Sequence, residues 1–181
     1  AFANELSIIC DKLDIDVWEL IKLANRHPRV NILQPGPGVG GHCVAVDPWF
    51  IVDSSPDEAR LIRMAREVND SKPDFVVAKV KEAAAKFKEP KIACLGLSYK
   101  EDIDDLRESP ALKIVESLLE SQIGQFFVVE PYIREVPKSL QNQKNIEIVD
   151  FEKGLFLSDI IGLMDKHREL HQINGWHLYT T

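Results

Sequence analysis

The sequence predicts an α/β protein, in which a helical unit over residues 1–88 precedes a small doubly wound parallel sheet over residues 89–181. Two observations predict this fold class. Apolar residues recur at helical spacing through the first half, whereas short apolar runs alternate with helical segments in the second half. Strands that alternate with helices are typical of a parallel sheet, because each strand must return through a crossover connection.

Residues 1–24 predict two helices. Apolar side chains at helical spacing indicate a helix that is already under way where the sequence begins; they are Phe2, Leu6, Ile9 and Leu13. Since no cap or turn residue precedes them, we expect the chain to be a fragment of a longer protein. Asp16, with Glu19 three residues later, resembles a capping box and begins the second helix.

Two further helices are expected after an irregular loop. Asp47 as N-cap and Pro48 at the first helical position begin a short helix. Residues 55–58 begin a long helix with a buried stripe, which comprises Ala59, Ile62, Ala65 and Val68. Residues 71–74 either kink or restart this helix, which continues to about Phe87. A helix of this length cannot bury its whole apolar stripe within one chain, so we expect a homodimer packed through residues 56–87.

The second unit alternates strands and helices. Apolar runs predict four strands, over residues 91–96, 126–130, 146–149 and 159–164. Ser109 and Pro110 begin the helix that follows the first strand, with Gly124 at its C-terminal cap, and residues 151–157 form a short helix.

The composition is that of an acidic globular chain. There are 22 Lys and Arg residues against 29 Asp and Glu residues, a net charge of −7, and 45% of the residues are hydrophobic. The acidic balance argues against nucleic acid or an anionic membrane surface as the main partner. No apolar stretch approaches the roughly 18–20 residues that cross a bilayer. Three cysteines without metal-type spacing suit reduced thiols, so we expect a cytoplasmic protein without a metal.

The loop over residues 27–43 is the strongest candidate for a functional site. It contains three prolines and four glycines, a density that excludes helix, and glycine lets a ligand or another backbone approach closely. Cys43 lies just before a helix start, where the partial positive charge favours a thiolate nucleophile, and Asp47 follows four residues later. This pattern predicts a covalent-catalysis site; a structural cysteine under a turn and a redox-sensing thiol are the alternatives. The glycines do not form a dinucleotide fingerprint, because no strand precedes them.

Three separated motifs resemble the UDP-glucose/GDP-mannose dehydrogenase family. They are Gly38-Val39-Gly40-Gly41-His42-Cys43 with Asp47, Gly96-Leu97-Ser98-Tyr99-Lys100, and Asp104-Asp105-Leu106-Arg107-Glu108-Ser109-Pro110. The resemblance covers residues 1 to about 170. Residues 26–33 and 47–50 most resemble the branch of the family that oxidises UDP-N-acetylmannosamine.

The resemblance implies a Rossmann-like second unit that binds a UDP-sugar, and an NAD-dependent oxidation of the sugar C6 alcohol to the carboxylate with two NAD⁺. It implies that Cys43 forms the thioester, that Asp47 holds the hydrolytic water, and that Gly40 lets the sugar lie against the backbone. Lys100 would contact the nucleotide sugar, and Arg107 would reach the NAD pyrophosphate.

Two regions leave alternatives open. Arg29, or in its place Arg26, would by analogy reach the sugar site of a partner subunit, and Asn31 belongs to the same substrate-binding segment. The NAD-binding domain of the family would lie upstream of Ala1, so we expect the chain to be inactive alone. The alternative is a dimerising nucleotide-sugar-binding module without catalysis. The sequences Lys166-His167 and Gly175–Thr181 depart from the family's pattern.

Overall fold

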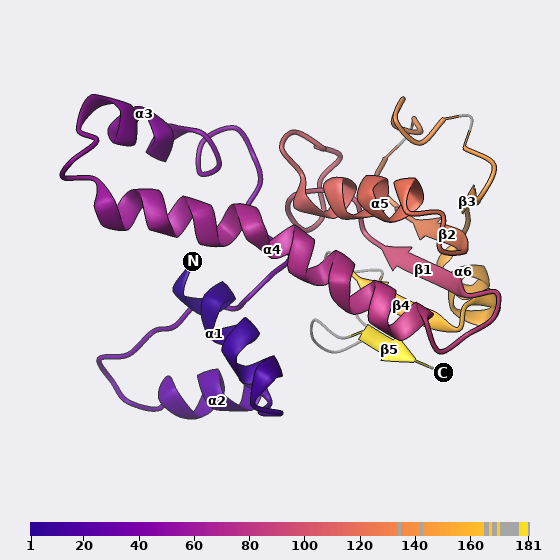
Figure 1. The fold of residues 1–181 in the computed structure, drawn as a ribbon, viewed down its shortest axis with the longest axis horizontal. Helices are drawn as coiled ribbons and strands as arrows, with labels where there is room; N and C mark the ends of the chain where they lie inside the picture. Colours follow the sequence, from indigo (N-terminus) through magenta and orange to yellow (C-terminus); the bar gives the residue numbers. More distant parts are fainter. Residues whose placement is uncertain (134, 142, 165–166, 168–169, 171–177, 181) are drawn as a thin grey trace.

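The computed structural model describes residues 1–133, 135–141, 143–164, 167, 170 and 178–180 (Figure 1). Its helices are α1 (Phe2–Lys12), α2 (Val17–Ala24), α3 (Asp47–Ser54), α4 (Arg60–Ala84), α5 (Pro110–Glu120) and α6 (Phe151–Leu157). Its strands are β1 (Lys91–Leu95), β2 (Gln125–Val129), β3 (Ile146–Ile148), β4 (Ile160–Leu163) and β5 (Leu178–Thr180).

The strands form one sheet in the order β3-β2-β1-β4-β5. The four strands β1 to β4 are parallel, with Ile92 paired to Phe126 on one side and to Ile160 on the other. The chain crosses the sheet in one direction from β1 to β2 and then to β3. The connection from β3 to β4 runs back past β2 and β1, so that β4 lies on the other side of β1. The predicted doubly wound parallel sheet is thereby confirmed. The antiparallel edge strand β5 was not predicted, and the rest of the divergent tail lies outside the described residues.

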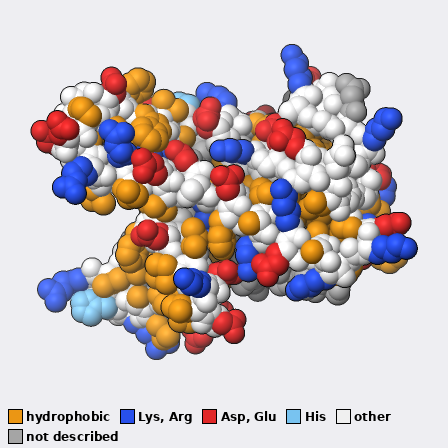
Figure 2. Space-filling view, viewed as in Figure 1, with side chains coloured by type: hydrophobic (Ala, Val, Ile, Leu, Met, Phe, Trp, Pro, Cys, Tyr) orange, Lys and Arg blue, Asp and Glu red, His pale blue; other side chains and the backbone are white. Residues whose placement is uncertain are grey.

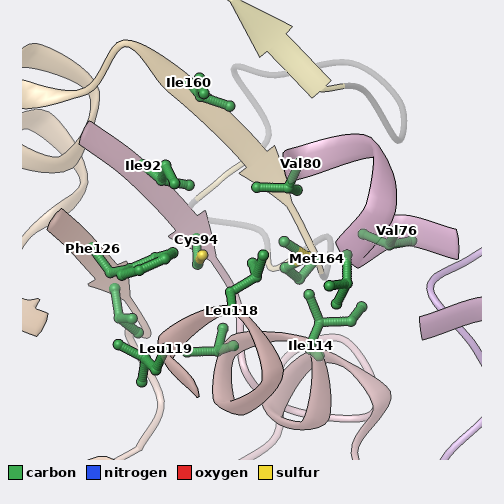
Figure 3. Close-up of a cluster of buried hydrophobic side chains, with 14 of the residues drawn as sticks. Val76, Val80, Ile92, Cys94, Ile114, Leu118, Leu119, Phe126, Ile160 and Met164 are labelled. Carbon is green, nitrogen blue, oxygen red and sulfur yellow. The ribbon is translucent and has the colours of Figure 1, made fainter. Parts of the chain in front are cut away.

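Helices cover both faces of the sheet. Successive residues of a strand point to opposite faces, so Ile92 and Cys94 of β1 face one layer whereas Ala93 and Leu95 face the other. The larger core lies between the sheet, α5 and the second half of α4, where Val80, Leu118 and Phe126 are fully buried (Figure 3). The smaller core lies under α6.

Helix α4 belongs to both halves of the molecule. Its first half packs against α3, and its second half contributes Val76, Val77 and Val80 to the core of the sheet (Figure 1). The helix runs without a break through Pro73, so the segment predicted to kink or restart it does not end it. The domain boundary expected at residue 88 therefore assigns the second half of α4 to the first unit, although this half packs into the core of the second unit.

The ends of several helices differ from the prediction. Asp16 caps α2 as expected, since its carboxylate accepts hydrogen bonds from two backbone N–H groups, and Ser109 caps α5. The N-cap of α3 is Val46, and Asp47 is already its first helical residue. Helix α4 begins at Arg60, later than residues 55–58. Helix α5 ends at Glu120, and its C-cap is Ser121 and not Gly124.

None of the helices in the described part of the chain combines the length and apolar content that a membrane span requires.

Candidate functional site

The candidate nucleophile lies on an exposed turn that leads into α3. Cys43 is exposed, whereas Cys10 and Cys94 are buried. The carbonyl of Cys43 accepts hydrogen bonds from the N–H groups of Val46 and Asp47, at 3.1 and 2.8 Å, and this closes the first turn of the helix. Asp47 is exposed one helical turn after the cysteine. The thiol and the carboxylate are therefore both open to a ligand from solvent.

A buried arginine of α4 anchors this turn. Arg66 is only 4% exposed, and its Nη1 donates to the carbonyl of Val44 at 3.2 Å. Its Nη2 donates to Asp70, one turn further along α4. Since Val44 follows Cys43 directly, Arg66 holds the backbone that carries the thiol. The sequence interpretation missed this residue; the Arg66–Asp70 spacing of four residues is the signal that marks it.

The glycine loop itself is fixed by two buried asparagines. The Asn4 Oδ1 atom accepts from the N–H of Gly36 at 2.8 Å, and its Nδ2 donates to Asn69 Oδ1 at 2.9 Å. Asn4 lies on α1 and Asn69 on α4, so the loop is tied to two helices at once.

The glycines make room for another part of the chain. A Cβ on Gly40 would lie 2.4 Å from the carbonyl oxygen of Glu108 and 2.7 Å from Cβ of Tyr99, and a Cβ on Gly41 would lie 2.8 Å from the Tyr99 ring. The N–H of Gly41 donates to the carbonyl of Arg107 at 3.1 Å. The loop after β1 therefore occupies the space beside Gly40, the position that the resemblance gives to the sugar.

This contact brings the three motifs of the sequence analysis together. Arg107 is exposed, and its Nε and Nη2 donate to the carboxylate of Asp105 at 2.5–3.0 Å. Hydrogen bonds from Arg107 lower the pKa of Asp105 to about 2, and Asp105 in turn raises the pKa of Arg107, with a smaller contribution from Cys43. Lys100 is exposed on the same loop. The exposed residues Cys43, Arg107 and Lys100 thus lie on segments that meet at the buried Gly40.

Arg29 and Asn31 lie elsewhere in the chain. The amide of Asn25 bonds both backbone groups of Ile32, at 2.9 and 2.7 Å, and so closes a loop over residues 26–31. Arg29 and Asn31 are exposed on this loop, which follows α2 on the side of α4 opposite α3 (Figure 1). Within the single chain they are not brought to the cysteine.

A buried polar network braces the carboxyl end of the sheet. Glu130, which follows β2, accepts from the N–H of Leu97 at 2.6 Å and lies 3.2 Å from Nε2 of His167. Nδ1 of His167 accepts from the N–H of Asp102 at 2.9 Å, so the neutral ring carries its proton on Nε2 and donates it. Burial opposes the ionisation of Glu130, yet hydrogen bonds from His167, Leu97 and Tyr132 outweigh it and lower the pKa.

This network supports the loop that carries Lys100. Both ends of the segment 97–102 are held, one by Glu130 and the other by His167. His167 lies in the part of the sequence that departs from the family's pattern, so its role was not foreseen.

The described residues do not by themselves form a cradle for a dinucleotide. Such a cradle needs free N–H groups at a helix that follows a strand directly. Here α5 begins 15 residues after β1, Pro110 has no N–H, and the hydroxyl of Ser109 already accepts from the N–H of Leu112 at 3.2 Å. Within the described residues, no group of three His, Cys, Asp or Glu side chains could hold a metal ion.

Comparisons with known proteins identify both units. The model of the UDP-glucose/GDP-mannose dehydrogenase family, central domain, matches residues 1–71, and the model of its UDP binding domain matches residues 93–180. The UDP-N-acetyl-D-mannosamine dehydrogenase of Campylobacter jejuni is 61% identical over 175 residues, 97% of this chain and 43% of that protein. The NDP-N-acetyl-D-galactosaminuronic acid dehydrogenase of Ralstonia nicotianae is 59% identical over 174 residues, 96% of this chain and 40% of that protein.

Solved structures agree. A UDP-D-ManNAc dehydrogenase from Pyrococcus horikoshii matches with a TM-score of 0.80 at 36% identity, over 96% of this chain and 40% of that one. A UDP-N-acetyl-mannosamine dehydrogenase from S. aureus matches with a TM-score of 0.78 at 40% identity, over 93% of this chain and 38% of that one. The chain therefore spans about 40% of the length of these relatives.

Proposed function

The chain belongs to the UDP-glucose/GDP-mannose dehydrogenase family, and from this premise we propose that it is the part of a nucleotide-sugar 6-dehydrogenase that holds the sugar covalently during oxidation. The observation that supports the proposal is that Cys43 is exposed directly after Gly40 and Gly41, which pack against the loop that carries Lys100 and Arg107. We propose UDP-N-acetylmannosamine as the substrate, which the names of several relatives support.

Cys43 would serve as the nucleophile. After the C6 alcohol has been oxidised to the aldehyde, Sγ adds to the aldehyde carbon and gives a thiohemiacetal. Loss of hydride from that carbon gives a thioester, and water then releases the carboxylate and restores the thiol. NAD, when bound, supplies the hydride acceptor for both oxidations. A thiolate suits this sequence because it both adds readily and leaves again.

The remaining residues would bind and orient. Asp47 is exposed one turn from Cys43 and would position the water that attacks the thioester. Lys100 and Arg107 would bring positive charge to the phosphates of the nucleotide sugar and of NAD, respectively. We expect the 181 residues alone to bind the sugar without reducing NAD⁺, since Arg107 alone makes no dinucleotide site.

A second copy of the chain would complete the site. Apolar side chains are exposed on α3 and on the first half of α4, where Phe50 is 68%, Leu61 83% and Met64 54% exposed. Figure 2 shows hydrophobic side chains gathered over α1 and α2 and again over α3, on either side of a deep notch. We propose that a homodimer covers the surface of α4, and that Arg29 and Asn31 of one subunit reach the sugar site of the other.

Protection of Cys43 tests the covalent role. The C6 aldehyde of UDP-N-acetylmannosamine should slow the alkylation of Cys43 by iodoacetamide, whereas UDP alone should not. The Lys100→Ala variant should weaken the binding of the nucleotide sugar in calorimetry. Equal alkylation with and without the aldehyde, at concentrations where binding is measured, would refute the covalent role.

Sedimentation tests the dimer. Leu61→Glu places a charge on the exposed face of α4 and should yield a monomer at micromolar concentration. Phe156→Glu is the matched control, since Phe156 is 88% exposed on the remote helix α6, and it should leave the dimer intact. A wild-type chain that sediments as a monomer contradicts the proposal.

A further inference from the structure

A cavity lies apart from the surface that carries Cys43. It has a volume of about 500 Å³ and lies between the α1–α2 pair and the middle of α4, next to the end of β4. Trp18, Phe75 and Met164 give it apolar walls, and Ser7 and Lys72 are the polar groups at its inner side. This volume accommodates a small molecule.

Lys72 is a buried amine without a carboxylate partner. The residue is only 4% exposed; Nζ donates to the hydroxyl of Ser7 at 2.6 Å and lies 4.5 Å from the centre of the Phe75 ring. Among the described residues no carboxylate lies within ion-pair distance of Nζ. Lys79 lies about two turns further along the same helix. It forms ion pairs with Asp11 and Glu82. The cavity therefore contains one buried amine without an ion pair and one lysine that is neutralised.

Burial makes this amine reactive. It lowers the pKa of Lys72 to about 8, an effect that the charge of Asp11 partly opposes. The other charged groups around the cavity are Asp14 and Asp16 on the α1–α2 turn and Lys79 on α4; β4 contributes no charged residue to its wall. At pH 8 about half of the Lys72 amines are neutral, roughly 100-fold more than for a lysine with an ordinary pKa. A neutral amine is the form that attacks carbonyl carbon.

We propose that this cavity captures small neutral aldehydes as a Schiff base on Nζ of Lys72. The nitrogen lone pair forms a bond to the carbonyl carbon, and the carbonyl oxygen becomes the hydroxyl of a carbinolamine. The C–O bond then breaks, and the oxygen leaves as water with both protons of the original amine, so no oxidant or reductant is needed. Trp18 and Phe75 would contact an apolar or aromatic substituent.

The charges around the cavity select for a neutral ligand. Asp14 and Asp16 lie at its rim, while Asp11 is paired with Lys79. An aldehyde that carries its own carboxylate would be repelled by Asp14 and Asp16, which form no ion pair with any residue that the structure describes, whereas a neutral aldehyde would not. Cys43 is not among the residues that line the cavity, so the proposal for Lys72 does not depend on whether the chain oxidises a sugar.

Reductive trapping tests the proposal. The purified chain is incubated at pH 8 with benzaldehyde and cyanoborohydride, and each lysine is quantified by peptide mass spectrometry. We expect Lys72 to be labelled at least tenfold faster than Lys79 or the exposed Lys100, and its rate to level off above pH 8 while theirs still rises. The anionic probe 4-carboxybenzaldehyde should label Lys72 more slowly than benzaldehyde does.

Matched variants separate the amine from the cavity. Lys72→Arg keeps a cation there and should remove the adduct on residue 72 alone, and Lys79→Arg should leave the labelling of Lys72 unchanged. Ile15→Trp adds bulk at a half-exposed wall position and should slow Lys72 selectively. Labelling of Lys72 no faster than that of Lys100, or unaffected by Ile15→Trp in a variant with wild-type circular dichroism, would overturn the proposal.

Discussion

Replacing Gly40 by alanine tests whether the glycine loop is shaped by the loop it packs against. An added Cβ would lie 2.4 Å from the Glu108 carbonyl oxygen, 2.7 Å from Cβ of Tyr99 and 2.9 Å from Cδ of Pro110. Normal contact starts near 3.4 Å, so the two loops must separate by about 1 Å. None of these atoms is the end of a flexible side chain. Overpacking of this kind costs about 1–3 kcal/mol, and three contacts below 3.0 Å place Gly40→Ala near 3 kcal/mol.

Gly36→Ala is the matched control in the same loop. Its Cβ would meet only the carbonyl of Gly38, at an ordinary 3.7 Å, so its stability should lie within about 1 kcal/mol of wild type. Urea and thermal denaturation measure the pair; for a chain of this size, about 3 kcal/mol corresponds to roughly 6–12 °C in Tm. The rate of Cys43 alkylation should change in Gly40→Ala and not in Gly36→Ala. Equal stability of the two variants would refute the reasoning.

Three further outcomes follow from the contacts described above. Asp16→Ala removes the acceptor for two N–H groups of α2 and should lower the free energy of unfolding by about 1 kcal/mol in urea, whereas an unchanged midpoint would refute the cap. Glu130 has a lowered native pKa, so its ionisation stabilises the fold above pH 4.5 and this stability is lost as the pH falls further; Glu130→Gln should flatten acid denaturation over that range, and an unchanged slope would contradict the network. Iodoacetamide at pH 9 should label Cys43 and spare Cys94, because burial raises the pKa of the Cys94 thiol to about 12, as mass spectrometry of the two peptides would report.

The sheet could be predicted because its signals are local. The central strands β1, β2 and β4 are continuous apolar runs, and helices α5 and α6 separate β1 from β2 and β3 from β4, so this alternation favours parallel pairing. The caps at Asp16 and Ser109 were equally local, since a capping side chain reaches only two or three residues along the chain. The short strand β5 carries no such run, and the antiparallel pairing with β4 depends on tertiary contact.

The polar face of α4 could not be predicted in the same way. The helix was expected to bury Ile62, Ala65 and Val68, which are only partly buried, while Arg66, Asn69 and Lys72 are more fully buried. Asn69 and Lys72 are satisfied by α1, 65 residues away along the chain, and helical periodicity holds no information about a partner at that distance.

The density of glycine in the loop over residues 27–43 was interpreted as room for a ligand or for another backbone segment. The structure shows that backbone and side-chain atoms of residues 99–110 fill the space at Gly40 and Gly41. The sequence can indicate that another group approaches a glycine closely, but it cannot show whether that group is a ligand or another segment of the chain. Residues of the loop after β1, including Tyr99 and Glu108, gave no signal of this packing.

The unbroken course of α4 connects the turn of Cys43, the candidate nucleophile, to the sheet. Arg66, near one end of this rod, holds the turn after Cys43, while Val80, near the other, is locked into the core of the sheet. A single helix thereby joins the turn that follows Cys43 to the core of the sheet. The one position at which the rod yields most readily is Pro73, which lacks an N–H to bond the carbonyl one turn earlier. Any relative motion of the two halves of the molecule should therefore pivot at Pro73 and should move Cys43 relative to the sheet.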